Sequence, residues 1–474
     1  MKLSRLEILS DAEVRQIHDA ALDILAECGV EVQSPRLLKL LQAKGATVDL
    51  AGARVRFPRA LAEDALSHAP AAFDLFNRDG EFAFRLGGGA AKVAAGHNAV
   101  FWTDTENGDP RPSTVADVAA FAAICEQLPE IDMVGIPVMP QDVADPKSTL
   151  LHGVRAVVEN TRKPVYFSTD CPRVNRGCLD LLQAACRGGD LRARPYGISQ
   201  LSPTSPLYWE ANPADAILDC LERGVPVAIL PEPNAGVSAP YSLAGLLTVN
   251  HAECLSGLIM IQLLQPGAKV MYANSWTTTD MRTGAALVGS IETTQCRVAA
   301  AQLARHCRIP SHTTAPNSDN HAHDEQNAWE KTFSLFAAQA AGHDLIVNCG
   351  MFATGMTCSH EQLVMDAEIA AMGRRLTGGI EVTAETIAAG LVKETGPRGS
   401  FLTADHTLER LASGEFWEPR VGVRGPHGAW LAAGSKNAYK RAQEQARACI
   451  ARGGATLPAE VQARLAAITA AFSA

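Results

Sequence analysis

Residues 311–368 read SHTTAPNSDNHAHDEQNAWEKTFSLFAAQAAGHDLIVNCGMFATGMTCSHEQLVMDAE, and they hold the pattern that decides the fold. A short apolar run, Ser311–Thr314, is followed by a polar loop, a helix-like segment at Glu325–Ala341 and a second apolar run at Leu345–Cys349. Polar side chains collect directly after both runs. Where strands alternate with helices, polar residues at strand ends mark the mouth of an α/β barrel, which is where barrel enzymes carry their chemistry.

The same alternation begins after Pro112, where seven strand–helix units are expected. The expected strands are Ile131–Val138, Val165–Thr169, Tyr196–Leu201, Val225–Pro231, Lys269–Asn274, Ser311–Thr314 and Leu345–Cys349. The segment Ala91–Trp102 can supply an eighth. Near-continuous apolar strands that alternate with helices indicate a parallel sheet covered on both faces. Neither nucleotide-binding fingerprint of open sheets follows any strand. The predicted fold class is therefore α/β, a TIM (β/α)8 barrel.

The barrel is expected to occupy residues 113–380, between two additions. Residues 1–112 are predicted to form a helical and β-rich cap, with helices at Ala12–Cys28 and Pro35–Ala43 and short strands between Phe73 and Asp104. Residues 381–474 are predicted to form a helical extension packed on the barrel.

Composition narrows the function class. The 474 residues are 47% hydrophobic and 20% charged, as in globular proteins with a large core. The formal net charge is −9 and no basic stripe is present, which argues against a nucleic-acid partner. No apolar run approaches the roughly 20 residues that span a bilayer, and the N-terminal segment lacks the apolar core of a signal peptide. The twelve cysteines are scattered without a C-x-x-C pair, so reduced thiols are expected. We expect a cytoplasmic enzyme with no membrane partner.

The predicted strand ends form a rim of acids, amides and aromatic rings. Its acids are Glu232 and Asp319, and its aromatic residues are Trp276 and Phe352. Its amides are Gln200, Asn274 and Asn348. Such a rim suits a small cation, because a quaternary ammonium has no hydrogen to donate and is held by charge and by aromatic faces, at about 0.5–2 kcal/mol per ring. A structural interpretation stays open, in which the two acids cap helices and Trp276 plugs the barrel.

Histidines 312, 321 and 323 lie close to Asp319 and Asp324, but without the i, i+4 spacing of a helical zinc site. No metal site is predicted. The run Asp319–Asp324 begins like the corrinoid-ligand motif D-x-H-x-x-G, with Asp324 where glycine is required. The chain is therefore not expected to carry a corrinoid of its own.

Several short motifs, spread in order over nearly the whole chain, resemble one family. They are Ser202–Leu207 (SPTSPL), Ala252–Gly257 (AECLSG), Gln262–Gly267 (QLLQPG), Asp280–Gly284 (DMRTG), Gly289–Glu292 (GSIE), Gly350–Phe352 (GMF), Glu361–Asp366 (EQLVMD) and Lys393–Gly396 (KETG). Together they resemble the trimethylamine methyltransferase superfamily, in its branch without pyrrolysine.

The resemblance implies a methyltransferase of one-carbon and methanogenesis-related metabolism that moves a methyl group from a methylated amine to a separate corrinoid protein. The expected substrate is a quaternary amine such as glycine betaine, proline betaine or carnitine, and the expected assembly is a homo-oligomer. Glu232 and Asp319 are the expected catalytic residues. The expected substrate-binding residues are Gln200, Asn274, Trp276, His312, Asn348 and Phe352. Two alternatives stay open: transfer from a betaine or sulfonium to tetrahydrofolate without corrinoid, and binding of a betaine without catalysis.

Overall fold

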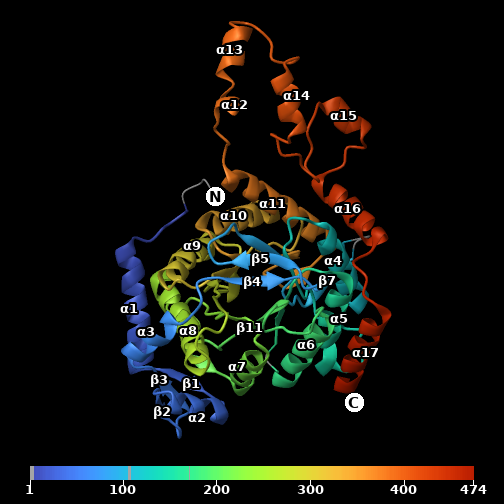
Figure 1. Ribbon diagram of the computed structural model, residues 1–474. Coiled ribbons are helices and arrows are strands. Elements are labelled where there is room, and N and C mark those ends of the chain that lie inside the picture. Colours follow the sequence, from blue (N-terminus) through green and yellow to red (C-terminus); the bar gives the residue numbers. More distant parts are fainter. Residues whose placement is uncertain (1–4, 105–107, 170, 474) are drawn as a thin grey trace.

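The computed structural model describes residues 5–104, 108–169 and 171–473. In this part of the chain an eight-stranded parallel sheet forms a central barrel (Figure 1). Its strands are β6 (Lys92–Ala95), β9 (Met133–Gly135), β10 (Val165–Ser168), β11 (Gly197–Leu201), β13 (Val227–Ile229), β14 (Val270–Tyr272), β17 (His312–Thr314) and β18 (Leu345–Cys349). Spatial neighbours follow chain order, and β18 pairs with β6.

One parallel bridge, Tyr272 to Ser311, joins β14 to β17 and completes the ring. The predicted barrel fold is confirmed. Its first strand, β6, comes from the segment that the sequence offered as an eighth strand, so the barrel begins before residue 113. The division into three regions stays a prediction.

Eight helices surround the strands, one after each (Figure 1). They are α4 (Val115–Gln127), α5 (Thr149–Asn160), α6 (Pro172–Ala185), α7 (Ala211–Arg223), α8 (Leu243–Leu264), α9 (Ile291–His306), α10 (Glu325–Ala341) and α11 (His360–Gly378), with a short 3-10 turn, η1 (Pro146–Ser148), before α5. Side-chain caps start several of them: Thr114 and Asp117 form a capping box at α4. Gly224 and Gly342 end α7 and α10 in the left-handed conformation, which glycine adopts without strain.

A hairpin of β4 (Phe73–Phe76) and β5 (Phe82–Leu86) closes one end of the barrel. Its side chains Phe73, Leu75, Phe84 and Leu86 share one buried cluster with residues that point inward from the barrel strands. The hairpin is tied to the N-terminal end of β18, because Asp344 Oδ1 accepts hydrogen bonds from the backbone of Gly87 and Gly88. The opposite end, at the carboxyl termini of the strands, is left for a site.

Shorter elements flank the barrel. The N-terminal part has helices α1 (Asp11–Glu27), α2 (Pro35–Ala43) and α3 (Arg59–Ser67) and a small sheet of β1 (Val30–Val32), β2 (Thr47–Asp49), β3 (Arg54–Arg56) and β12 (Tyr208–Trp209). Near the mouth lie β7 (Phe101–Thr103), β8 (Pro110–Arg111), β19 (Met351–Phe352), β20 (Thr357–Cys358) and the hairpin β15 (Thr278–Asp280) and β16 (Ala285–Leu287).

The C-terminal region divides into two parts. Helices α16 (Ala438–Arg452) and α17 (Ala459–Ser473) pack against the helical ring, on α4 and α11 and on α5 and α6 respectively. Helices α12 (Ala384–Ile387), α13 (Ala389–Thr395), α14 (Asp405–Ala412) and α15 (His427–Ala432) project away from the barrel instead (Figure 1). Helices α16 and α17 thus pack on the barrel, whereas α12 to α15 project from it.

Helix α8 is the most apolar long helix. By length and composition it is the one helix among the described residues that could cross a membrane. Its sequence is not a continuous apolar run, because Asn250, His251 and Glu253 interrupt it. In its apolar 18-residue stretch, 78% of the residues are buried inside the fold, as in the core helix of a globular protein.

Candidate active site at the barrel mouth

A cavity of about 510 Å³ lies at the carboxyl ends of the barrel strands. Seven of the eight strands, all except β9, contribute lining residues from their ends or from the loops that follow. The lining comprises His97, Asn98, Ser168, Gln200, Ser202, Glu232, Asn234, Ser275, Thr277, Ala286, Val288, Thr314, Asn317, Asn348, Met351, Thr354, Gly355 and Met356. We call this cavity the mouth pocket. Its position is the one that barrel enzymes use for catalysis.

The mouth pocket has one carboxylate. Among its described lining residues, Glu232 is the sole acid, and no lysine or arginine is present. The Glu232 side chain is exposed to the pocket, yet its surroundings are those of a protein interior. Burial raises the pKa of Glu232, and a hydrogen bond from Ser275 opposes the rise. A cation placed beside this carboxylate would favour its ionised form.

Polar side chains below Glu232 are tied together. The Tyr166 hydroxyl, on β10, donates a 2.6 Å hydrogen bond to Gln200 Oε1. On the other side of the pocket, His97 Nδ1 donates to Asn348 Oδ1 over 3.1 Å, and Asn348 Nδ2 donates to Asn317 Oδ1 over 2.9 Å. Burial lowers the pKa of His97, so its imidazole is neutral. These bonds fix the direction in which the Gln200 and Asn348 amides face the pocket.

His312 lies beneath this network, outside the pocket lining. Its ring is fully buried and stacks on Tyr166, with the ring centroids 5.3 Å apart and the planes 20° apart. Neither ring nitrogen has a hydrogen-bond partner among the described residues. Burial holds the pKa of His312 well below its ordinary value. The ring therefore acts as a neutral support for Tyr166.

Three more of the expected site residues lie behind the pocket. Asn274 is buried and spans β14 and β17: its Nδ2 donates to the His312 carbonyl over 2.8 Å, and its Oδ1 accepts from Thr313 over 2.6 Å. Trp276 is buried in the core. Asp319 accepts hydrogen bonds from the backbone of Val288 and Gly289 at 2.8 and 3.0 Å, so it holds one wall of the pocket in place.

Phe352 lines a different cavity, of about 500 Å³, together with His321, His323 and Tyr439. Its ring contacts His323, with the centroids 4.4 Å apart. Of the eight expected site residues, the structure thus brings Gln200, Glu232 and Asn348 together in the mouth pocket. It does not place Asn274, Trp276, His312, Asp319 or Phe352 in its lining. The expected aromatic wall of Trp276 and Phe352 is absent from the described lining, and the catalytic and binding roles stay predictions.

Sequence reasoning missed His97, Asn98 and Tyr166. The first two follow β6, in a segment that the sequence placed in the N-terminal cap, although they stand directly after an apolar run like the other rim residues. Tyr166 lies within a strand, and only the alternation of inward and outward side chains could have assigned it to the interior.

Two groups of histidines lie outside the mouth pocket. His323 Nδ1 lies 2.9 Å from Gln362 Oε1 and its ring stacks on Tyr439, so a hydrogen bond explains its position. The donor atoms of His18, His251 and Cys307 lie within 4.8 Å of one another. However, His18 Nδ1 and His251 Nε2 are 2.9 Å apart, which is a hydrogen-bond distance. Neither cluster supports assigning a metal.

Comparison with known proteins identifies the family of this chain. The family described as trimethylamine methyltransferase (MTTB) matches residues 1–471. The chain belongs to this family. Trimethylamine methyltransferase MttB of Desulfitobacterium hafniense is 32% identical over 438 residues, which cover 92% of this chain and 88% of that protein. MttB of Methanosarcina barkeri is 32% identical over 453 residues, covering 93% and 90%.

Another relative of this trimethylamine methyltransferase family member is the glycine betaine methyltransferase of Desulfitobacterium hafniense, 29% identical over 437 residues that cover 90% of this chain and 89% of the relative. The solved monomethylamine methyltransferase of Methanosarcina barkeri shares the fold, with a TM-score of 0.58 at 12% identity over 94% of this chain and 88% of the other. The predicted family and the methyltransferase class are confirmed.

Proposed function

We propose that the chain demethylates a small quaternary amine in the mouth pocket and passes the methyl group to a corrinoid held by a separate protein. The observation that carries this proposal is the lone carboxylate of Glu232, which faces a pocket whose described lining offers it no cationic partner. The surroundings of this carboxylate raise its pKa, and a nearby cation favours its ionised form. A monovalent cation of the substrate supplies the missing charge.

The remaining lining suits a betaine. Amides and hydroxyls, among them Gln200, Ser202 and Asn234, can donate hydrogen bonds to a substrate carboxylate, whereas the quaternary nitrogen needs none. Met351 and Met356 add polarizable apolar contacts for N-methyl groups. The pocket therefore offers a negative group for the ammonium and neutral donors for the opposite end of a zwitterion.

The leaving group explains why the pocket needs no strong acid. Breaking an N–CH₃ bond of a quaternary ammonium leaves both electrons on nitrogen and releases a neutral tertiary amine, so no proton has to be delivered. When bound, the corrinoid supplies the strongly nucleophilic acceptor. The task of this chain is to hold the N–CH₃ bond in one direction, which is catalysis by orientation.

The rim of the mouth pocket suits a protein partner. Met356 is 44% exposed, and its carbonyl accepts hydrogen bonds from the backbone of Val100 and Phe101, whose side chains are also exposed. On the loops after β13 and β15 the exposed apolar residues are Val237, Tyr241 and Met281. Exposed apolar residues gathered around a pocket mark an interaction surface. A corrinoid protein that docks here would cover the pocket and exclude water.

The thiols agree with a reducing compartment. All twelve cysteines of the sequence are free in the structure, as expected where disulfides are kept reduced. A corrinoid acceptor in its reduced form also requires such a compartment. We therefore place the reaction in the cytoplasm.

The test is methylcobalamin formation from cob(I)alamin with a panel of glycine betaine, proline betaine, carnitine and trimethylamine. The expected result is turnover of at least one quaternary amine, and the Glu232→Gln variant should bind that substrate at least tenfold more weakly. Glu325→Gln, on the exposed start of α10, is the matched control and should bind as the wild type does. Methyl transfer to tetrahydrofolate without cobalt, or tight binding without any turnover, would contradict the proposal.

A further inference from the structure

Residues 380–436 form an arm that extends from the barrel and returns to it (Figure 1). Its four helices, α12 to α15, contain no buried residue. Apolar side chains nevertheless recur along it. Of the 28 large hydrophobic side chains that are exposed among the described residues, 11 lie in this arm. An arm of this composition facing water is energetically unfavourable, since exposed apolar surface costs about 25 cal/mol per Å².

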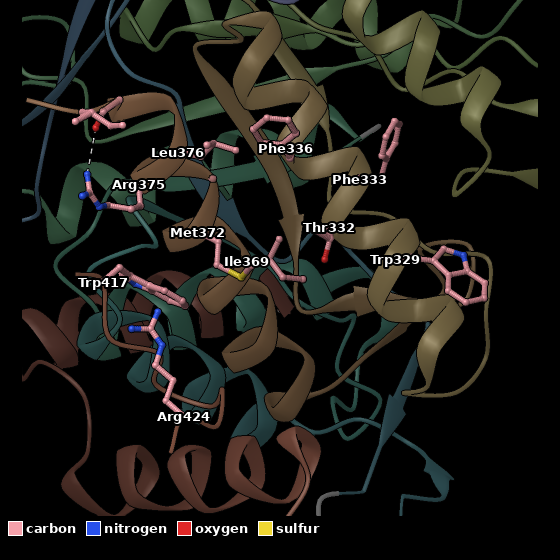
Figure 2. Close-up of a pocket in the computed structure, with 13 residues that line it drawn as sticks. Trp329, Thr332, Phe333, Phe336, Ile369, Met372, Arg375, Leu376, Trp417 and Arg424 are labelled. Carbon is pink, nitrogen blue, oxygen red and sulfur yellow. Dashed lines mark hydrogen bonds between the residues drawn. The ribbon is translucent and has the colours of Figure 1, made fainter. Parts of the chain in front are cut away.

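An apolar groove of about 1100 Å³ opens at the root of the arm. Figure 2 shows its wall: side chains from α10, among them Trp329 and Phe333, and from α11, among them Met372 and Leu376. Trp417, in the returning limb of the arm, closes one side, and the guanidinium of Arg424 lies 5.7 Å from the centroid of its ring. The projecting helices α12 to α15 point away from this groove and leave it open (Figure 1). The groove and the arm are thus two unpartnered apolar surfaces on one chain.

The total surface is larger than a monomer of this mass should have. The accessible area is 20139 Å². The scaling of surface with mass gives about 17,000 Å² for a compact monomer of 50.3 kDa. The excess of about 3,000 Å² per chain, or about 6,000 Å² for two chains, is at the upper end of the total area that permanent homodimers bury, which begins at roughly 2,000 Å² and exceeds about 5,000 Å² in the largest.

We propose that two copies of this chain exchange arms, with the arm of each copy lying in the groove of the other. A second copy is the occupant that these features favour, because it brings a groove for the arm and an arm for the groove in one contact. Since the groove lies at the arm's root, a two-fold axis between the roots generates both contacts together and closes the assembly at two chains. The inference does not depend on the substrate of the mouth pocket.

The oligomeric state of the full chain tests the proposal, measured by light scattering after size exclusion at several concentrations. The expected result is a dimer, or a larger assembly built from dimers. The arm variant Leu408→Glu with Leu411→Glu changes two exposed residues of α14, and the groove variant Phe333→Glu with Met372→Glu changes two exposed residues of the groove. Each variant should raise the dissociation constant of the dimer more than tenfold. Leu40→Glu with Leu50→Glu, two exposed positions of the N-terminal part, is the matched control and should stay dimeric.

Mixing the two variants separates arm exchange from other dimers. A chain with an altered arm keeps its groove, and a chain with an altered groove keeps its arm, so the mixture restores one of the two contacts. Differently tagged variants should therefore co-purify as a heterodimer, although each alone is monomeric. Far-UV circular dichroism and the melting temperature check that each variant is folded. A monomeric wild type, a dimer unaffected by either variant, or two dissociated variants that fail to pair would each overturn arm exchange.

Discussion

Lys331 of α10 and Asp366 of α11 form an ion pair that is completely buried behind the mouth pocket, with Nζ 2.8 Å from Oδ2. Asp366 also accepts a 2.7 Å hydrogen bond from the backbone of Gly350, and Lys331 donates to the Pro316 carbonyl over 3.3 Å. The pair thus ties two parts of the barrel to the helices outside them: the segment after β17, which carries Asn317, and the end of β18, which carries Asn348. The ion pair thus helps to position Asn317 and Asn348, although neither of its charged side chains lines the mouth pocket.

Lys331→Met should destabilise the protein strongly, by about 3–5 kcal/mol, because it leaves the Asp366 carboxylate buried without its partner. Urea unfolding at neutral pH measures this loss. The double variant with Asp366→Asn removes both charges and keeps an acceptor for Gly350, so it should be more stable than the single variant. Arg155→Ala removes the half-buried surface pair with Glu159 and should cost no more than about 1 kcal/mol. Equal instability of the single and double Lys331 variants would show that the unpaired charge is not the cause.

Glu253 should make the stability of the protein depend on pH. This residue of α8 accepts hydrogen bonds from the Leu207 backbone at 2.8 Å and the Ser205 hydroxyl at 2.7 Å. Burial nevertheless raises its pKa from 4.5 to about 7. The folded state then binds the proton more tightly than the unfolded state, so stability falls as the pH rises from about 4.5 to about 7. Glu253→Gln should remove this fall, which is on the order of 3 kcal/mol.

Melting temperatures recorded across this pH range compare the wild type with Glu253→Gln. The matched control is Glu460→Gln, an exposed position in the first turn of α17. Its pH profile should follow that of the wild type. A wild-type profile without a fall in this window would mean that Glu253 is ionised throughout.

Tyr166→Phe should weaken substrate binding, although Tyr166 is not part of the mouth pocket lining. The change removes the donor of the 2.6 Å hydrogen bond to Gln200, a pocket residue, which then loses its fixed orientation. A several-fold rise in Kd, measured by calorimetry, and a loss of about 1–3 kcal/mol in unfolding free energy are expected. Tyr196→Phe is the control, since its buried hydroxyl has no hydrogen-bond partner among the described residues. It should leave both quantities nearly unchanged.

Phe352→Leu should leave the affinity for a quaternary amine within about twofold of the wild type, because the ring lines the neighbouring cavity and packs on His323. Calorimetric titration with tetramethylammonium and with the preferred betaine measures this affinity. The Glu232→Gln variant, run beside it, should show the larger loss. A loss of several-fold to tens-fold for Phe352→Leu would show that the ring reaches the cation, as a cation–π contact of about 0.5–2 kcal/mol requires.

The helices were predictable from sequence because their ends are marked locally. The bounds predicted for α2 and α10 match the structure, and capping side chains or a terminal glycine mark ends of both helices. Most strands were predicted too long, although β18 has the predicted bounds: β9 covers Met133–Gly135, where the sequence suggested Ile131–Val138. The apolar run continues into buried loops, and burial alone does not distinguish a paired strand from the extended chain beside it.

The same limit explains why several of the expected residues lie outside the mouth pocket. Asn274 and Trp276 follow the apolar run of β14, but the strand itself ends at Tyr272. Asn274 then turns toward β17 and Trp276 enters the core, which depends on contacts across the barrel that the sequence does not display. Glu232 was expected at the barrel mouth because it directly follows an apolar run, and it lines the mouth pocket. Phe352 lines the neighbouring cavity, whereas the residue before it, Met351, lines the mouth pocket.

The junction of β14 and β17 has a consequence for how the barrel opens. The other neighbouring strands share two or more paired residues, whereas these two share the single bridge of Tyr272 and Ser311. The Asn274 amide replaces part of the missing ladder by bonding to the His312 carbonyl. Local opening follows the weakest cooperative boundary. Amide hydrogens along this junction should therefore exchange with solvent before those of the other strand pairs. The barrel should open first between β14 and β17.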